Sequence, residues 1–271
     1  MFTLPSWLPL SVYVWALQMV VFHGVGYACE YCDRNRILRR AKVRDIDRKS
    51  YRQLLPRVLA NQVFVLLPCM MAMQALGLCF SGQPHLPFWL FIGGMIFMGV
   101  GHDVVQYATH RYLLHRPSLM RTLRHSIHHS TGASKGISAC YMSAPDFFLE
   151  ITLPYLLPLA VIGGGGSDVL FHSLIAGLGA VGGVYEHSGY DLARLLPREA
   201  IAAHTPRWVK VVGSLITSHA HGEHHAKGNV SFSDGFGSPG MCDSVFGTRW
   251  DLVEARRREQ ELATAAATPA E

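Results

Sequence analysis

The chain has 271 residues, and only 16% of them are charged, against about 25% in a typical soluble domain. Its mean hydropathy is positive, and together with the low charge this indicates a membrane protein. The net charge of +5 is modest, and we expect no nucleic-acid partner. Six cysteines contain a single CxxC pair, Cys29 and Cys32, which argues against a secreted disulfide framework and predicts free thiols.

Apolar segments predict an all-α integral membrane bundle of about four to five membrane helices. The first segment carries no charged side chain and is long enough to cross a bilayer, with a signal peptide as the alternative interpretation. Residues 58–102 are also uncharged, and a turn rich in Gly and Pro at 81–87 divides them into a hairpin. A second hairpin surrounds the glycine run 163–166, and its helices either cross the bilayer or dip into one leaflet. The expected membrane helices are about 7–29, 58–80, 87–108, 149–166 and 169–186.

Ten of the 24 Lys and Arg residues fall between Arg34 and Arg57. One interpretation is a solvated loop, and the other is a cytoplasmic loop that lies against anionic headgroups, as the positive-inside rule predicts. With the second interpretation, each hairpin returns the chain to the side that it left. The histidine-rich segments then form a helical cap on the cytoplasmic face of the membrane.

The chain is more polar from about Asp191 onward. Residues 208–217 are expected to form an amphipathic helix at the membrane interface. We expect residues 1–254 to form a single domain, and residues 255–271 to form a charged tail that begins as a helix and becomes disordered.

The segment His110–His129 holds five of the fifteen histidines. Within it, His125, His128 and His129 are spaced i, i+3 and i+4, so on a helix they share one face. The same spacing returns in the HGEHH segment that begins at His221. Because neutral imidazole is the commonest protein metal ligand, we expect the fold to bring these two triplets together around metal.

Nine histidines are candidate metal ligands, with His219 as a tenth candidate. One zinc ion takes about four ligands, so nine imidazoles fit two ions of four to five ligands each. Nitrogen-rich ligation suits Zn, Fe, Cu or Ni rather than Mg or Ca. His110 and His115 are about 140° apart on an ideal helix, so they share an ion only if the helix bends or ends there. The nine candidates are His110, His115, His125, His128, His129, His187, His221, His224 and His225.

Two acidic residues lie near these candidates. Asp103 is seven residues before His110 and falls on the same helix face, where it would accept the second ring N–H of a ligand; the alternative is a charge at a helix end. Glu223, inside HGEHH, either supports a ligand or is solvated. His219 is two residues from His221, a spacing that points the two side chains apart on a helix.

The motifs HRYLLH, HSIHH and HGEHH resemble the three histidine boxes of the fatty acid hydroxylase/sterol desaturase superfamily, with Asp103 in the acidic position before the first box. Residues 186–191 look like the HSGYD segment of C-4 methylsterol monooxygenases, and residues 243–248 are similar to the closing WDRLFGT. The resemblance runs from about His102 to Trp250. It departs at Cys242, at 235–237 and at 144–145, where the family has Trp, Asn-Tyr-Gly and His-Pro, and we expect these positions to shape the substrate tunnel.

This resemblance implies an oxidoreductase that uses O2 and two Fe ions, with zinc as an alternative ion in a purified sample. The reaction would oxidise an unactivated C–H bond of a lipid, by hydroxylation or methyl oxidation of a sterol or related lipid. Fatty-acyl hydroxylation or desaturation is the alternative. No catalytic group is expected beyond the metal centre, and electrons would come from a ferredoxin or similar protein that docks on the basic face. Rival functions are a membrane metal-binding or transport protein, which needs polar groups along a route through the helices, and a zinc hydrolase.

Overall fold

The computed structural model describes residues 4–46, 48–196, 212–213, 216–233 and 240–267. Within these residues the regular structure is helical, with one isolated bridge between Lys42 and Tyr190. The prediction of an all-α bundle with a histidine-rich helical region is therefore confirmed.

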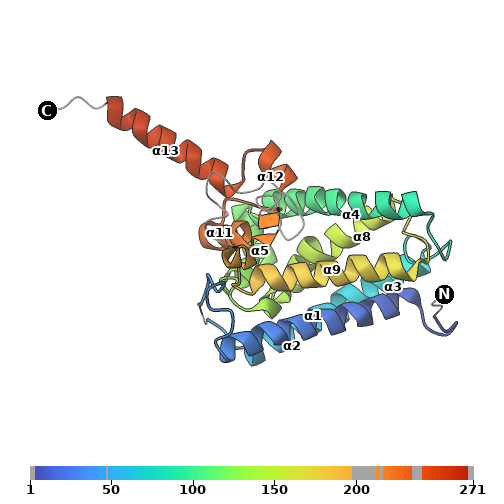
Figure 1. Cartoon of the computed structure of the whole chain (residues 1–271). Helices are drawn as coiled ribbons and strands as arrows, with labels where there is room; N and C mark the ends of the chain where they lie inside the picture. The colour runs from blue at the N-terminus through green and yellow to red at the C-terminus, as the bar shows by residue number, and fades with distance from the viewer. Residues whose placement is uncertain (1–3, 47, 197–211, 214–215, 234–239, 268–271) are drawn as a thin grey trace.

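Five long apolar helical segments make up the bundle (Figure 1). Each is long and apolar enough to cross a membrane. Much of their apolar surface faces outward, and Phe64 and Trp89 are 76% and 79% exposed. Exposed apolar surface on this scale indicates contact with lipid. The segments are α1 (Leu10–Arg34), α2–η1–α3 (Tyr51–Asn61, Gln62–Leu66, Leu67–Ala75), α4–η2 (Phe88–Thr109, His110–Leu114), α7–η4–α8 (Ala144–Phe147, Phe148–Thr152, Leu153–Val161) and α9 (Val169–His187).

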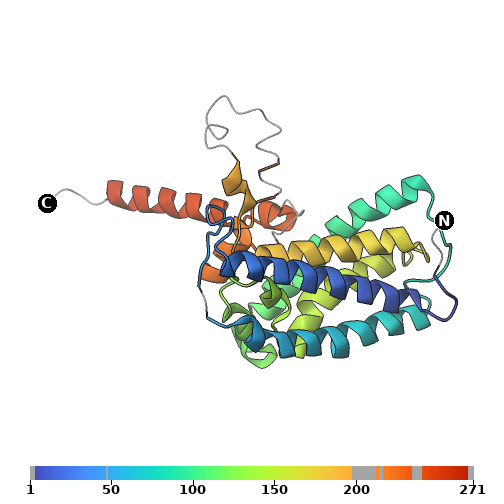
Figure 2. The ribbon, with the colours of Figure 1, turned by 60° about the horizontal axis from the view of Figure 1, so that its bottom comes forward.

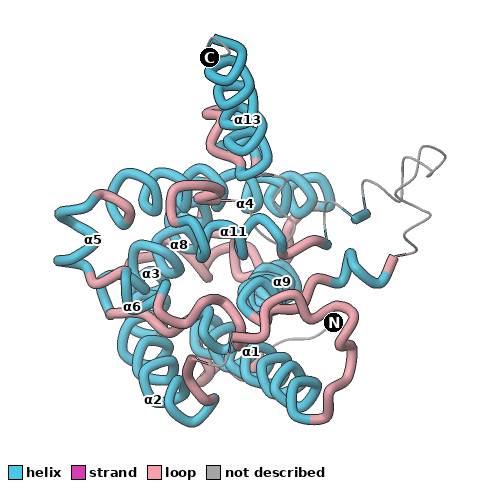
Figure 3. The backbone as a smooth tube through the Cα atoms, turned by 90° about the vertical axis from the view of Figure 1, so that its left-hand side faces the viewer, coloured by secondary structure: helices cyan, strands magenta, loops and turns pink. Residues whose placement is uncertain are grey.

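Short helices cover one end of this bundle, where α5 and α11 lie against the ends of the long helices (Figures 1 and 3). The last described helix, α13 (Trp250–Ala267), projects away from the same end (Figure 2). The short helices are α5 (Pro117–Leu123), α6 (Ser126–His129), η3 (Gly136–Cys140), η5 (Leu192–Leu195), α11 (His219–Lys227) and α12 (Met241–Val245).

At the opposite end, the turns of the two predicted hairpins pack on each other. Asp168 caps α9 by accepting a hydrogen bond from the backbone N–H of Phe171 at 3.0 Å. It also accepts one from the backbone N–H of Leu86, in the other turn, at 2.8 Å. Gly164 has a φ of +77°, and a Cβ there would meet the backbone of Leu78. Only glycine combines this left-handed conformation with so close an approach. The glycine run therefore allows the turns of the two hairpins to pack directly on each other.

The long helices converge on the covered end through close packing. Helix α9 packs against α1 and α4, and α4 packs against α8. At Gly101, in α4, these two helices approach so closely that an added Cβ would meet the ring of Pro158, in α8. This packing brings the end of α4, with His110, beside the end of α9, with His187.

The basic segment between α1 and α2 is drawn into the protein at two points. The Lys42 ammonium donates to Asp33 at 2.6 Å and to the carbonyl oxygen of Ser188 at 2.8 Å. The partly buried Arg44 guanidinium donates to the carbonyl oxygen of Glu186 at 3.1 Å. These cations therefore anchor the segment to the end of α9, which differs from a fully solvated loop.

The charged C-terminal segment forms helix α13, which runs to Ala267. Ion pairs of Glu254 with Arg257 (2.9 Å) and Arg258 (3.4 Å) lie at i, i+3 and i+4 and stabilise this helix locally. Several alanines further along are strong helix formers. Most of the expected interfacial helix at 208–217 lies outside the described residues.

Candidate metal centre

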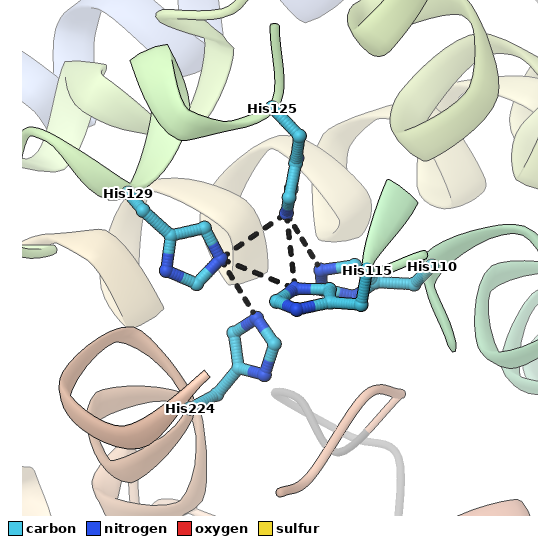
Figure 4. A group of neighbouring side chains, drawn as sticks. All are labelled: His110, His115, His125, His129 and His224. Atoms are coloured by element: carbon cyan, nitrogen blue, oxygen red, sulfur yellow. Dashed lines mark hydrogen bonds between the residues drawn. The ribbon is translucent and has the colours of Figure 1, made fainter. Parts of the chain in front are cut away.

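Nine histidines meet at the covered end of the bundle in two separate sets. In each set, ligand nitrogens from all members lie within 4.8 Å of one another. Both sets draw on α11, and the structure brings together all nine of the sequence candidates. Set A, shown in Figure 4, is His110, His115, His125, His129 and His224. Set B is His128, His187, His221 and His225.

Each histidine triplet contributes to both sets. From the first triplet, His125 and His129 belong to set A while His128 belongs to set B. The HGEHH triplet is divided in the opposite sense, since His224 joins set A and the other two join set B. Residues four apart share a helix face and adjacent residues do not. Each triplet therefore supplies side chains to both sets.

A wide helical turn resolves the spacing of His110 and His115. The segment His110–Leu114 is a π-helix, and the backbone N–H of His115 donates to the carbonyl oxygen of His110 at 2.9 Å. An i to i+5 bond adds a residue to the turn, so residues five apart come nearly into line. Both rings therefore point into set A.

Backbone carbonyls determine which ring nitrogen carries the proton in several candidate ligands. His110 Nδ1 lies 2.7 Å from the carbonyl oxygen of Phe232, and His224 Nδ1 lies 2.8 Å from that of Val230. A carbonyl oxygen only accepts, so each Nδ1 must donate. The Nε2 atom of each neutral ring is then a lone pair that faces the set. His187 is oriented in the same way, with Nδ1 at 2.9 Å from its acceptor on Gly183.

The nitrogen separations fit a cation better than hydrogen bonds. His125 Nδ1 donates to the Asp146 carboxylate at 2.9 Å, so its Nε2 is also a lone pair. Yet this Nε2 lies 3.2 Å from that of His110 (Figure 4), and two lone pairs at that distance repel. Two nitrogens that share a metal ion, each about 2.0–2.1 Å from it, lie about 3.3 Å apart in a tetrahedral site. The donor set therefore fits a bound transition-metal ion.

Set B carries a second indication of the same kind. Both ring nitrogens of His225 are buried and have no hydrogen-bond partner. The Nε2 atoms of His187 and His221 are 2.9 Å apart, and those of His187 and His128 are 3.1 Å apart. Buried polar atoms without partners are costly, and a metal ion in set B would satisfy them.

The environment keeps these imidazoles neutral, as metal ligation requires. Burial, reinforced by the neighbouring histidines, lowers the pKa of His115, His129 and His224 to about 3. The same causes hold the pKa of His225 well below its usual range. At neutral pH the nitrogens of these rings are therefore free to bind a metal ion.

Several supporting groups were not foreseen from the sequence. Asp146 follows the second box and orients His125. Asp243 accepts hydrogen bonds from the backbone N–H groups of Phe232 and Ser233 at 2.9 and 2.7 Å, and so it fixes the strip of backbone that orients His110. No sequence spacing predicts these contacts, since they join segments that are distant along the chain. The only available indication was the likeness of residues 243–248 to a closing family motif.

Asp103 acts at a different place from the one expected. Its carboxylate accepts hydrogen bonds from the backbone N–H groups of Met241 and Cys242, at 3.1 and 3.0 Å. These N–H groups begin α12, so Asp103 stabilises the helix that carries Asp243. The ring N–H of His110 is held by a backbone carbonyl instead.

His219 and Glu223 lie on the outer side of α11. His219 belongs to neither set, and its ring packs edge-on against Trp250 at 4.5 Å. The Glu223 carboxylate pairs with Lys227 at 2.8 Å and lies 3.8 Å from His219 Nε2. The structure therefore places both residues among the surface contacts of α11.

An apolar cavity of about 390 Å³ leads from between the long helices to the histidines. Its inner end is polar and includes His187, His221 and Ser233, whereas Leu66 and Met70 line it among the long helices. The cavity thus joins the lipid-facing bundle to set B through His187 and His221, and Glu150 also lines it.

The expected tunnel positions do not line this cavity. Among the described residues, its walls include none of Cys242, Ala144 and Pro145. Cys242 is the second residue of α12, and Ala144 is the first residue of α7, so both lie in the first turn of a helix. Residues 235–237 lie outside the described residues.

Residues 95–248, more than half of the chain, match the family model described as fatty acid hydroxylase. The matched range contains all nine histidines of the two sets. Neither the curated proteins nor the solved structures give a match.

Proposed function

Because the chain belongs to the fatty acid hydroxylase family, whose members are lipid-modifying oxidoreductases, we propose that it is an O2-dependent di-iron monooxygenase of a membrane lipid. The observation that carries this proposal is the pair of histidine sets at the end of an apolar cavity. Two bound iron ions would supply the power to activate O2 and break an alkyl C–H bond, which no side chain has. Set A would hold one ion and set B the other.

The chain itself supplies orientation and exclusion of water. His187 and His221, at the inner end of the cavity, are each only 5% exposed, so bulk solvent has little access to that end. The apolar walls, which include Met98 and Ile175, favour a hydrocarbon body and present one of its carbons to the histidines. A shielded site also protects a reactive oxidant from side reactions.

We propose a sterol or related polycyclic lipid as the first substrate class, on the likeness of residues 186–191 to the HSGYD segment. A fatty-acyl substrate is the second candidate, because only part of this segment contacts the cavity. Of that segment, Glu186 and His187 line the cavity, whereas Tyr190 holds Asp33 by a hydrogen bond at 2.9 Å. The segment therefore supports anchoring of the basic segment as well as substrate contact.

We further propose that the histidine end faces the cytoplasm and receives electrons from a ferredoxin or similar acidic protein. Arg34 and Arg39, whose side chains are 66% and 62% exposed, carry positive charge at this end. Positive charge favours the cytoplasmic side and attracts an acidic donor. High salt should slow turnover with the protein donor but leave turnover with a small-molecule reductant unchanged. Equal salt dependence of the two would contradict the docking proposal.

The central experiment is anaerobic reconstitution of the purified protein with Fe(II), followed by exposure to O2 and analysis of lipid products. We expect about two irons per chain and a hydroxylated lipid that forms only with iron, O2 and reductant. Separate sterol and fatty-acyl pools would identify the substrate class. Turnover with zinc alone or without O2 would contradict the monooxygenase and favour a hydrolase, while metal uptake without any oxidised product would favour the metal-binding alternative.

A further inference from the structure

A carboxylate outside the three histidine boxes lies between the two histidine sets. Glu150 Oε1 is 3.9 Å from His110 Nε2, in set A, and 3.6 Å from His128 Nε2, in set B. Two ligands of one ion lie about 3.3 Å apart when each bond is about 2.0–2.1 Å and the site is tetrahedral. Oε1 is therefore only slightly further from a nitrogen of each set than two ligands of one ion are from each other.

The Glu150 carboxylate has little else to bind. The residue is 2% exposed, and its Oε2 atom has no hydrogen-bond partner. In the described part of the chain, its ion-pair contacts are with histidines alone; besides those above, Oε2 lies 3.4 Å from His125 Nδ1. That ring N–H already donates to Asp146 at 2.9 Å. A buried carboxylate without a cation is strongly unfavourable, and two metal ions would offset that cost.

The local backbone is deformed where Glu150 occurs. It lies in the π-helix Phe148–Thr152, and the backbone N–H of Leu153 bonds to the carbonyl oxygen of Phe148. Such wide turns insert one residue into an α-helix and are frequent at functional sites. Asp146, one turn earlier, meets the outer nitrogen of His125, so it orients that ring. Glu150 reaches past it to the inner nitrogens and also lines the cavity.

From this geometry we propose that Glu150 is a further metal ligand whose carboxylate bridges the ions of set A and set B. The inference rests on the proposed di-iron centre. A bridging carboxylate would hold the two ions at a fixed separation beside the inner end of the cavity. It also accounts for a buried acid that the histidine motifs leave unexplained.

The test is anaerobic titration of the metal-free protein with ⁵⁷Fe(II), read by metal analysis, Mössbauer spectroscopy and parallel-mode EPR. For the wild type we expect two irons per chain with a coupled, integer-spin signal. In Glu150→Gln we expect binding of the second iron to weaken at least tenfold and the coupling to disappear. The matched control is Glu223→Gln, since Glu223 lies on α11 between histidine ligands but on its outer side, paired with Lys227 at 2.8 Å; its coupled signal should remain.

A second variant guards against a merely structural effect. Glu150→Ala leaves space for a small carboxylate, so added formate should restore the coupled signal if a bridge is what was lost. Two tightly bound, coupled irons in Glu150→Gln would overturn the proposal, and so would failure of formate to restore the signal.

If neither variant folds, the wild-type protein still decides the matter. A structure of the iron-loaded wild type should place Glu150 oxygen within bonding distance of both ions, about 2.0–2.2 Å for a carboxylate on a divalent transition metal. A carboxylate bound to neither ion, or to only one, would overturn the bridge. The proposed function fails by a different result, namely a wild type that binds no iron or oxidises no lipid with O2.

Discussion

At the scale of single residues, the imidazoles are prepared for metal before any ion arrives. Carbonyl or carboxylate oxygens accept a hydrogen bond from Nδ1 of four rings, and burial keeps the Nε2 atoms, which face the sets, unprotonated. Lone pairs are thereby forced together at about hydrogen-bond distance, as between His110 and His125. A bound cation would relieve this repulsion, so we expect metal binding to stabilise the fold at this site.

The two sets should lose their ions independently. His115 belongs to set A alone and His225 to set B alone. We expect His115→Ala and His225→Ala each to lower the iron content from about two to about one per chain and to abolish lipid oxidation. His219→Ala is the control, because His219 is in neither set, and it should retain both ions. Loss of both ions from either variant would show that the sets are not separate.

The residue that orients a ligand should matter nearly as much as the ligand. Asp146→Asn removes the charge that holds the His125 ring N–H. Loss of such a partner typically weakens metal binding about 10–100-fold, and we expect this weakening in set A, while set B is little changed. Competition with a chelator measures it, and an unchanged affinity in set A would contradict the assigned role.

At the scale of helical elements, small departures from regular geometry do most of the positioning. The π-helix His110–Leu114 aligns ligands that a regular helix would separate. Helix α11 presents its residues to both sets, and it can do so only by lying very close to the basic segment. An added Cβ on Gly222, in α11, would overlap the Arg44 guanidinium, which is held by the carbonyl oxygens of Ala133 and Glu186.

Gly222→Ala should therefore destabilise the protein and displace α11. Overpacking of this kind typically costs about 1–3 kcal/mol, and here it should lower both thermal stability and iron content. Gly24→Ala, in α1, is the matched control, since nothing lies within 4 Å of an added Cβ there. We expect that variant to match the wild type or to be slightly more stable, because alanine favours a helix. Equal behaviour of the two variants would contradict the close approach.

At the scale of the whole molecule, the two histidine sets lie at one end of the five apolar segments and the tight hairpin turns lie at the other. The turns at Gly82 and Gly164 lie at the end away from the histidines. The cavity begins among helices with outward apolar faces, so a lipid can enter from the bilayer without crossing water. This arrangement separates the substrate's source from the polar end, where an electron donor would dock.

The proposed orientation can be tested by labelling of single cysteines in a cysteine-depleted background. Gln83→Cys lies on the exposed turn and Arg39→Cys on the basic segment at the histidine end. In intact cells, a membrane-impermeant maleimide should label the first and not the second, while lysed cells should give both. The reverse pattern would place the histidines on the outer side and contradict the cytoplasmic assignment.

The sequence by itself determined the helical class, the apolar segments and the nine histidines, because hydropathy and side-chain spacing are local properties. Histidine type and spacing indicated two ions, but not which histidine joins which set. That assignment depended on the tertiary structure, because it follows from a π-turn and from how α6, α9 and α11 face one another. The carboxylates of Asp146 and Glu150 and the bracing by Asp243 likewise required the fold. They act across long stretches of chain, and packing alone brings such groups together.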